Sequence, residues 1–135
     1  MIVVDTNIIV HFILNGTEKN IVTEVHKKTP IWLAPRLWQT EFLSVLSVYL
    51  RKDILQFEDI LNAQFKAKQM MSSFSLEVEP IEVLELINTS SCSSYDCEFV
   101  ALAKDLEVPL LTFDKKILAE FPETAIHPKD FVTEE

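Results

Sequence analysis

Glycine is almost absent from this sequence, in which Gly16 is the one glycine among 135 residues. Loops that cradle phosphate groups need several glycines, because their backbone must approach the phosphate closely. The scarcity of glycine therefore argues against P-loop and dinucleotide-binding proteins. The sequence also lacks a GxSxG nucleophile elbow, which argues against acyl-transfer chemistry.

Cysteines and long apolar runs are scarce as well. Cys92 and Cys97 do not form a CxxC pair and are too few for a disulfide framework, so we expect free thiols in a reducing compartment. No apolar run approaches the roughly 18–20 residues that span a membrane. The first residues lack the basic region of a signal peptide. We therefore expect a cytoplasmic protein without a membrane partner.

Positively charged residues are fewer than negatively charged ones. Twelve Lys and Arg residues stand against twenty-one Asp and Glu residues, so that the net charge is −9. Such a field repels nucleic acids and membrane surfaces unless a local feature reverses it. The charge is the strongest argument in the composition against a nucleic-acid substrate.

Short buried strands alternate with helices along the chain. The predicted strands are 1–4, 31–34, 76–78, 108–112 and 125–126. The predicted helices are a first one ending near residue 14, then 18–28, 36–52, 57–71, 80–87, 94–106 and 115–121. This alternation predicts an α/β fold, a three-layer α/β/α sandwich with a short, mostly parallel central sheet. We expect one domain over 1–135, with its core in about 1–126 and a frayed acidic tail at 128–135.

Two acidic residues follow predicted strands. Asp5 comes directly after the strand 1–4, and Asp114 lies two residues beyond the strand that ends near Thr112. Ligands of open α/β sheets bind at the carboxyl edge, where these two residues are expected. Each of them could instead be an ordinary N-cap or turn residue.

Two further acids stand near predicted helix starts at the same edge. Asp96 lies in the first turn of the helix 94–106, where the helix dipole alone favours an acid. Glu41 is harder to explain in that way, because the segment 37–43 is apolar enough to be largely buried and buried acids need a partner. Two bare carboxylates about 4 Å apart repel by roughly 4 kcal/mol at an effective dielectric constant of 20. A cluster of four is therefore typical of a site for a hard cation such as Mg²⁺ or Mn²⁺.

Polar neighbours of these acids have candidate supporting roles. Thr6 is expected to cap the first helix and can also position a ligand, while Asn7 is expected to orient Asp5 rather than bind metal. Thr112 is expected to hydrogen-bond beside Asp114, although strand propensity also explains a threonine there.

Few cationic or imidazole groups are well placed for chemistry. Arg36, Lys115 and Lys116 flank the predicted carboxyl edge and are candidate phosphate contacts. The three histidines have no common spacing for zinc or a catalytic triad, so surface or capping roles are expected for them. Hydrolysis by a carboxylate-held cation needs no histidine base.

Four segments together resemble the acidic signatures of PIN-domain nucleases. They are Val3-Val4-Asp5-Thr6-Asn7, Thr40-Glu41-Phe42, Tyr95-Asp96-Cys97 with Val100-Ala101-Leu102-Ala103, and Leu111-Thr112-Phe113-Asp114. Their order and the chain length most resemble the VapC-type toxins of toxin–antitoxin pairs. Cys97 departs from the pattern, since a small alanine is common there. 

The resemblance implies a metal-dependent endoribonuclease with an RNA substrate and an antitoxin partner. It also implies one or two Mg²⁺ or Mn²⁺ ions, held by the residues that match the family's acids: Asp5, Glu41, Asp96 and Asp114. The alternative is a catalytically weak PIN-like module that binds protein or RNA without a toxin role. A phosphotransferase of the haloacid-dehalogenase type fits less well, because it needs a second Asp where this chain has Asn7.

Self-association is expected from one helix. The segment 37–50 carries more apolar surface than a single helix stripe can bury. A two-fold dimer is the commonest way to cover such a helix. We therefore expect a homodimer.

Overall fold

The structure, a computed structural model, describes residues 1–134. The strands are β1 (Ile2–Val4), β2 (Trp32–Pro35), β3 (Ser75–Leu76), β4 (Leu110–Leu111) and β5 (Ala125–Ile126). The helices are α1 (Thr6–Ile13), α2 (Lys19–Lys28), α3 (Leu37–Arg51), α4 (Phe57–Met71), α5 (Pro80–Thr89), α6 (Ser94–Leu106), α7 (Lys115–Glu120) and α8 (Pro128–Thr133). Within this described part, no helix is long and apolar enough to cross a membrane.

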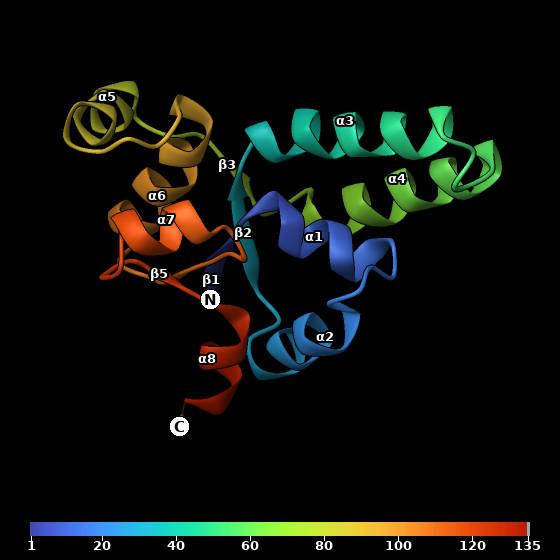
Figure 1. The fold of residues 1–135 in the computed structure, drawn as a ribbon, viewed down its shortest axis with the longest axis horizontal. Coiled ribbons are helices and arrows are strands. Elements are labelled where there is room, and N and C mark those ends of the chain that lie inside the picture. The colour runs from blue at the N-terminus through green and yellow to red at the C-terminus, as the bar shows by residue number, and fades with distance from the viewer. Residues whose placement is uncertain (135) are drawn as a thin grey trace.

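The five strands form one sheet in the order β3-β2-β1-β4-β5, and every neighbouring pair is parallel. Every residue of β1 and β2 is buried, as expected for a parallel sheet covered on both faces. Helix α6 packs across β1, β2 and β4, and Figure 1 shows α1 and α2 on the opposite side of β2 from α6 and α7. The predicted α/β class is confirmed, and the sheet is parallel throughout.

The scarcity of glycine is visible in the turns. Asn15, Asp53 and Glu107 adopt the left-handed backbone conformation, with φ values of 53°, 54° and 56°. Glycine usually occupies such positions because a side chain is strained there. Gly16 serves a different purpose, since a Cβ atom at this position would lie 2.2 Å from Nδ1 of His11.

The C-terminal segment is a helix, and the expectation of a frayed tail was wrong for residues 128–134. Phe131 is buried, and Nζ of Lys28 donates to its carbonyl oxygen at 2.6 Å. The side chain of His127 caps α8 by accepting a hydrogen bond from the amide of Lys129. An acidic composition favoured fraying, but one buried aromatic residue and a lysine from α2 hold the helix in place. Residue 135, also part of the predicted tail, lies outside the described residues.

Candidate active site

One pocket, which we call the acidic pocket, lies at the carboxyl ends of β1 and β4. It has a volume of about 420 Å³. Its lining residues are Asp5, Thr6, Asn7, Val10, Glu41, Ser44, Val45, Asp96 and Asp114. The structure therefore brings together the four acids that the sequence placed at this edge, from four segments far apart in the chain.

Asp5 is the most constrained of these acids. It is the N-cap of α1, and its Oδ1 accepts a hydrogen bond from the amide of Thr6 at 2.8 Å. Its Oδ2 accepts a hydrogen bond from the hydroxyl of Thr112 at 2.6 Å. Burial, with a smaller contribution from the charges of Glu41 and Asp96, raises the pKa of Asp5 from 3.8 to about 6 despite these bonds.

Glu41 reaches the same pocket from α3. Its Oε1 accepts a hydrogen bond from the hydroxyl of Thr6 at 2.6 Å. Burial raises the pKa of Glu41, and the nearby charge of Asp96 adds to the effect. Thr6 is not the N-cap of α1, which corrects the sequence expectation, because Asp5 caps the helix instead. The Thr6 hydroxyl is thereby free to hold Glu41.

Asp96 and Asp114 stand at the starts of two other helices. Asp96 lies in the first turn of α6, whose N-cap Ser93 accepts a hydrogen bond from the Asp96 amide. Burial raises the pKa of Asp96, and the charge of Asp114 adds to the effect. Asp114 is the N-cap of α7, and its Oδ1 accepts hydrogen bonds from the amides of Lys116 and Ile117. Asp114 therefore caps a helix and lines the acidic pocket at the same time, and Asp96 lines the pocket from the first turn of its helix.

Thr112 connects two of the acids. It is completely buried, its hydroxyl donates to Asp5, and its Oγ1 accepts a hydrogen bond from the Asp114 amide at 3.0 Å. The hydrogen bond beside Asp114 matches the sequence expectation. The bond to Asp5 adds a link between β1 and β4 that sequence spacing did not reveal.

Asn7 differs from its expected role. No hydrogen bond joins it to Asp5 in residues 1–134, and its buried Oδ1 has no hydrogen-bond partner there. A buried amide oxygen without a donor is costly unless a ligand or water satisfies it. The Asn7 oxygen is therefore an additional acceptor available in the acidic pocket.

The side chains that line the acidic pocket are of the type that binds a hard cation. The lining side chains offer carboxylate, amide and hydroxyl oxygens, and Mg²⁺ and Mn²⁺ prefer oxygen ligands. Among residues 1–134, no three His, Cys, Asp or Glu side chains are already close enough together to hold a metal ion. Mutual repulsion between carboxylates without a counterion favours such separation. The residues present therefore match the chemistry of a divalent cation, although they do not form a closed ligand group.

The predicted cationic residues lie around this pocket rather than in it. Lys115 and Lys116 are exposed first residues of α7, and the charge of Lys116 slightly offsets the raised pKa of Asp96. Arg36 is exposed and forms an ion pair with Glu77, with 3.4 Å between Nη1 and Oε1. Of these three cations, Lys116 is the one whose charge affects an acid of the pocket.

Sequence reasoning missed three lining residues. Ser44 lies three positions after Glu41, and Val10 lies three positions after Asn7. Residues three apart share a helix face, so this spacing could have identified both. Val45, four positions after Glu41, follows the same rule.

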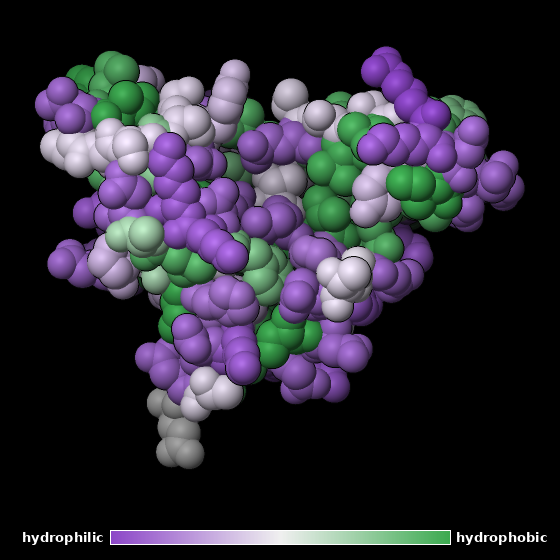
Figure 2. All heavy atoms as spheres, in the orientation of Figure 1, coloured by the Kyte–Doolittle hydropathy of each residue, from purple (hydrophilic) through white to green (hydrophobic). Residues whose placement is uncertain are grey.

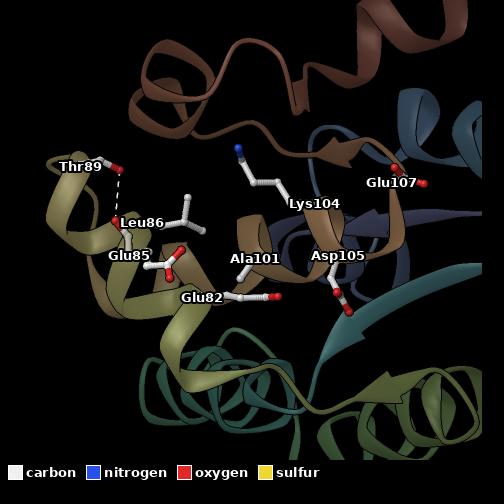
Figure 3. A pocket seen from close by; sticks show the side chains of 8 residues that line it. All are labelled: Glu82, Glu85, Leu86, Thr89, Ala101, Lys104, Asp105 and Glu107. Atoms are coloured by element: carbon white, nitrogen blue, oxygen red, sulfur yellow. Dashed lines mark hydrogen bonds between the residues drawn. The ribbon is translucent and has the colours of Figure 1, made fainter.

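A second pocket with four acids lies between α5 and α6, and we call it the α5–α6 pocket (Figure 3). Its charged lining residues are Glu82, Glu85, Lys104, Asp105 and Glu107. Glu107 follows the last residue of α6, about 16 Å along the helix axis from Asp96 at 1.5 Å per residue. This pocket is therefore distinct from the acidic pocket and away from the carboxyl edge of the sheet.

Comparison with known proteins agrees with the fold. The sequence matches the PIN domain family over residues 2–124, and the chain belongs to that family. PIN domains are generally nucleases, so the chain is of a nuclease type. The crystal structure of PAE2754 from Pyrobaculum aerophilum is similar, with a TM-score of 0.71 and 21% sequence identity over 97% of this chain and 92% of that one. No curated protein matches the sequence.

Proposed function

We propose that this protein is a divalent-metal-dependent endoribonuclease that hydrolyses RNA phosphodiester bonds. The observation that carries the proposal is the acidic pocket, where four carboxylates converge at the carboxyl edge of the sheet. Burial first and neighbouring acidic charges second raise the pKa values of Asp5, Glu41 and Asp96, and such shifted carboxylates cluster at functional sites.

The residues that would hold one or two Mg²⁺ or Mn²⁺ ions are Asp5, Glu41, Asp96 and Asp114, with the Asn7 oxygen as an additional acceptor. Such a cation neutralises charge on the phosphoryl group and lowers the pKa of bound water. The threonines orient the cation ligands: the Thr112 hydroxyl holds the carboxylate of Asp5, and the Thr6 hydroxyl holds that of Glu41.

Substrate contacts would come from Lys115 and Lys116 at the start of α7 and from Arg36. Exposed ammonium groups bind phosphate oxygens without reading the base. Because the net charge is −9, we expect weak substrate binding and slow or selective cleavage, strongly dependent on salt.

The proposal is tested with end-labelled single-stranded RNA and a DNA of the same sequence. We expect internal cleavage of the RNA with Mn²⁺ or Mg²⁺ and no cleavage with a chelator. RNA binding without cleavage under all conditions would favour the alternative, a catalytically weak PIN-like binding module. Cleavage that persists in the chelator would contradict metal dependence.

We further propose that the protein is the toxin of a type II toxin–antitoxin pair. An antitoxin segment would order on binding, place apolar side chains beside α3, and direct an Arg toward the acids. The pocket supports this arrangement because Val10 and Val45 line it next to Glu41. A guanidinium pairs with carboxylates bidentately and stays charged when it is desolvated.

The antitoxin proposal is tested with the protein encoded by the neighbouring reading frame. Complex formation should be weaker for Glu41→Gln and Asp96→Asn than for the wild type. High salt should slow association of the wild type, since opposite charges steer the encounter. Unchanged affinity and association rate in both variants would show that inhibition does not work through the acidic pocket.

A further inference from the structure

An apolar groove lies along α5 beside the start of α6, and we call it the α5 groove. It has a volume of about 310 Å³. Figure 2 shows hydrophobic side chains gathered over α5. The α5 groove and the α5–α6 pocket have no lining residue in common. The walls of the groove come mainly from α5 and its far side from α6: Pro80, Val83, Leu84, Ile87, Ser94 and Glu98.

Glu98 is the one charged side chain among the described residues that line this groove. It is half-buried, and its carboxylate forms no hydrogen bond or ion pair within residues 1–134. A partly buried carboxylate beside apolar walls is costly unless a donor satisfies it. A ligand that fits the groove should therefore combine a flat apolar body with N–H donors directed at Glu98.

The α5 groove lies near the acidic pocket. Burial raises the pKa of Glu98, and the charge of Glu41 adds to the effect, so these two carboxylates are within electrostatic reach of each other. Glu98 also follows Asp96 by two residues, about 3 Å along the axis of α6. Tyr95, which precedes Asp96, is 58% exposed and offers an aromatic face on which a base can stack. A nucleotide next to a phosphate in the acidic pocket is therefore within reach of the groove.

The dimensions of the groove favour a single base over a peptide. The residues of α5 that line it between Val83 and Ile87 cover about 6 Å of helix axis. A peptide helix in a groove is held by anchors spread over about two turns, which is longer. The volume is at the lower end of the range of roughly 300–1,000 Å³ for ligand pockets. A base is also neutral, so the acidic surroundings that repel the RNA backbone do not repel it.

The carboxylate of Glu98 discriminates between bases by their donors. An ionised carboxylate only accepts hydrogen bonds, and its two oxygens can accept two at once. Guanine has two neighbouring donors, N1–H and N2–H, on its Watson–Crick edge, whereas adenine, cytosine and uracil have one donor group each. RNA-binding proteins read single-stranded bases on this edge.

We propose that the α5 groove binds a guanine base of the RNA substrate, with Glu98 accepting hydrogen bonds from N1–H and N2–H. The inference rests on the proposed ribonuclease function and deepens it, because Glu98 then determines which sites are cleaved. Glu98 is a specificity-determining residue in this arrangement, whereas the acids of the acidic pocket act at the phosphate.

The first test measures cleavage of a uridine-rich RNA that carries one guanosine, with inosine or adenosine in its place as matched substrates. With Mn²⁺, the wild type should cleave beside guanosine at least about tenfold faster than beside adenosine, the range of a good bidentate contact. Inosine lacks the N2 amine and should fall between them. Glu98→Gln should lose the preference through slower cleavage beside guanosine, and Glu85→Gln, the control, should keep it. Equal wild-type rates for guanosine and adenosine, or a preference that Glu98→Gln retains, would overturn the proposal.

The second test needs no cleavage. Guanosine and inosine monophosphate carry the same phosphate, so a difference between them reports the base alone. Titrated in a chelator, guanosine monophosphate should shift the amide resonances of residues 83–87 and 94–98, and inosine monophosphate should bind several-fold more weakly. Glu98→Gln should bind both equally. Equal binding of the two nucleotides by the wild type would contradict the guanine site.

The two tests separate this inference from the proposed nuclease function. Selective binding of guanosine monophosphate without any RNA cleavage would support the guanine site and contradict the nuclease. Cleavage without a preference for guanosine would overturn only the guanine site. Loss of antitoxin binding in Glu98→Gln, with the cleavage preference unchanged, would assign the groove to the antitoxin and also overturn the proposal.

The walls of the groove are tested with two exposed residues of α5. Leu84 and Ile81 are 62% and 66% exposed, but only Leu84 lines the groove. Leu84→Ser should weaken both nucleotides by the same factor, about threefold, because it removes apolar contact without changing Glu98. Ile81→Ser should leave both affinities unchanged. Equal effects of the two variants would show that the base does not enter the groove.

Discussion

The acidic pocket and the α5–α6 pocket each contain four carboxylates, yet they differ in how those groups are held. In the acidic pocket, Asp5, Glu41 and Asp114 accept hydrogen bonds from neighbouring residues through their side chains. In the α5–α6 pocket, the charged side chains form no hydrogen bond or ion pair with any other residue among 1–134, and most are exposed (Figure 3). The α5–α6 pocket is also the larger one, at about 510 Å³ against 420 Å³.

The difference shows that neither the volume of a pocket nor the number of acids lining it identifies a candidate active site in this fold. The acids of the α5–α6 pocket come from two consecutive helices, where Glu82 and Glu85 share a face simply because they are three residues apart. Those of the acidic pocket come from four separate segments that only the sheet topology brings together. Bringing four charges together against their repulsion needs an explanation, whereas a solvated acidic face does not.

The largest expected difference between the pockets is in catalysis. Asp5→Asn should reduce metal-dependent RNA cleavage by about 100-fold or more, because it removes one of the clustered charges. Glu85→Gln, the matched change in the α5–α6 pocket, should leave the rate unchanged. Initial rates at saturating Mn²⁺ measure both. Equal losses in the two variants would show that total charge, rather than the acidic pocket, controls cleavage.

A smaller effect is expected from the residues that hold the acids. Thr112→Val removes the donor to Asp5 and should lower the rate by about 10- to 100-fold, as for other residues that orient metal ligands. Thr112→Ser keeps the hydroxyl and should retain most of the activity. Thr89→Val, which removes a 3.2 Å bond to the Glu85 carbonyl in the other pocket, should have no effect. Equal rates for Thr112→Val and Thr112→Ser would exclude the orienting role.

The positions of the four acids could be predicted because strand ends and helix starts share one edge of a parallel sheet. Asp5 and Asp114 follow strands, Asp96 lies in a first helical turn, and Glu41 is the fifth residue of α3. The sequence pattern is therefore enough to place them. The individual contacts could not be predicted. The bond between Thr6 and Glu41 joins residues 35 positions apart and depends on how α1 packs against α3.

Element ends and the tail were harder to predict for a similar reason. The strand expected at 108–112 is only Leu110–Leu111, and the helix expected at 80–87 continues to Thr89. Helix α8 depends on the contact of Lys28 with Phe131, which spans 103 positions. Local composition carries no information on such long-range contacts.

The smallest expected effect concerns stability without divalent cations. Because the pKa of Asp5 is about 6 in the folded chain against 3.8 ordinarily, the folded state binds this proton more tightly. The stabilisation of the folded state by this proton is complete below about pH 4 and is lost as the pH rises through 6. At 1.36 kcal/mol for each pKa unit, the loss is at most about 3 kcal/mol.

Asp5→Asn should therefore be more stable than the wild type at pH 7, by about 1–2 kcal/mol after the loss of hydrogen bonds to the carboxylate. The advantage should disappear near pH 4, as urea unfolding at a series of pH values would show. The free energy of unfolding of Glu85→Gln should equal that of the wild type at every pH. A variant that is less stable than the wild type at pH 7 would mean that Asp5 acts mainly as a helix cap.

The claim that the acidic pocket is built for a divalent cation is tested most directly by calorimetric titration with Mn²⁺. The wild type and the double variant Glu85→Gln/Asp105→Asn should bind Mn²⁺ with the same affinity. The double variant Glu41→Gln/Asp96→Asn should show no specific binding. Loss of binding in the α5–α6 variant, with binding intact in the acidic-pocket variant, would contradict the account.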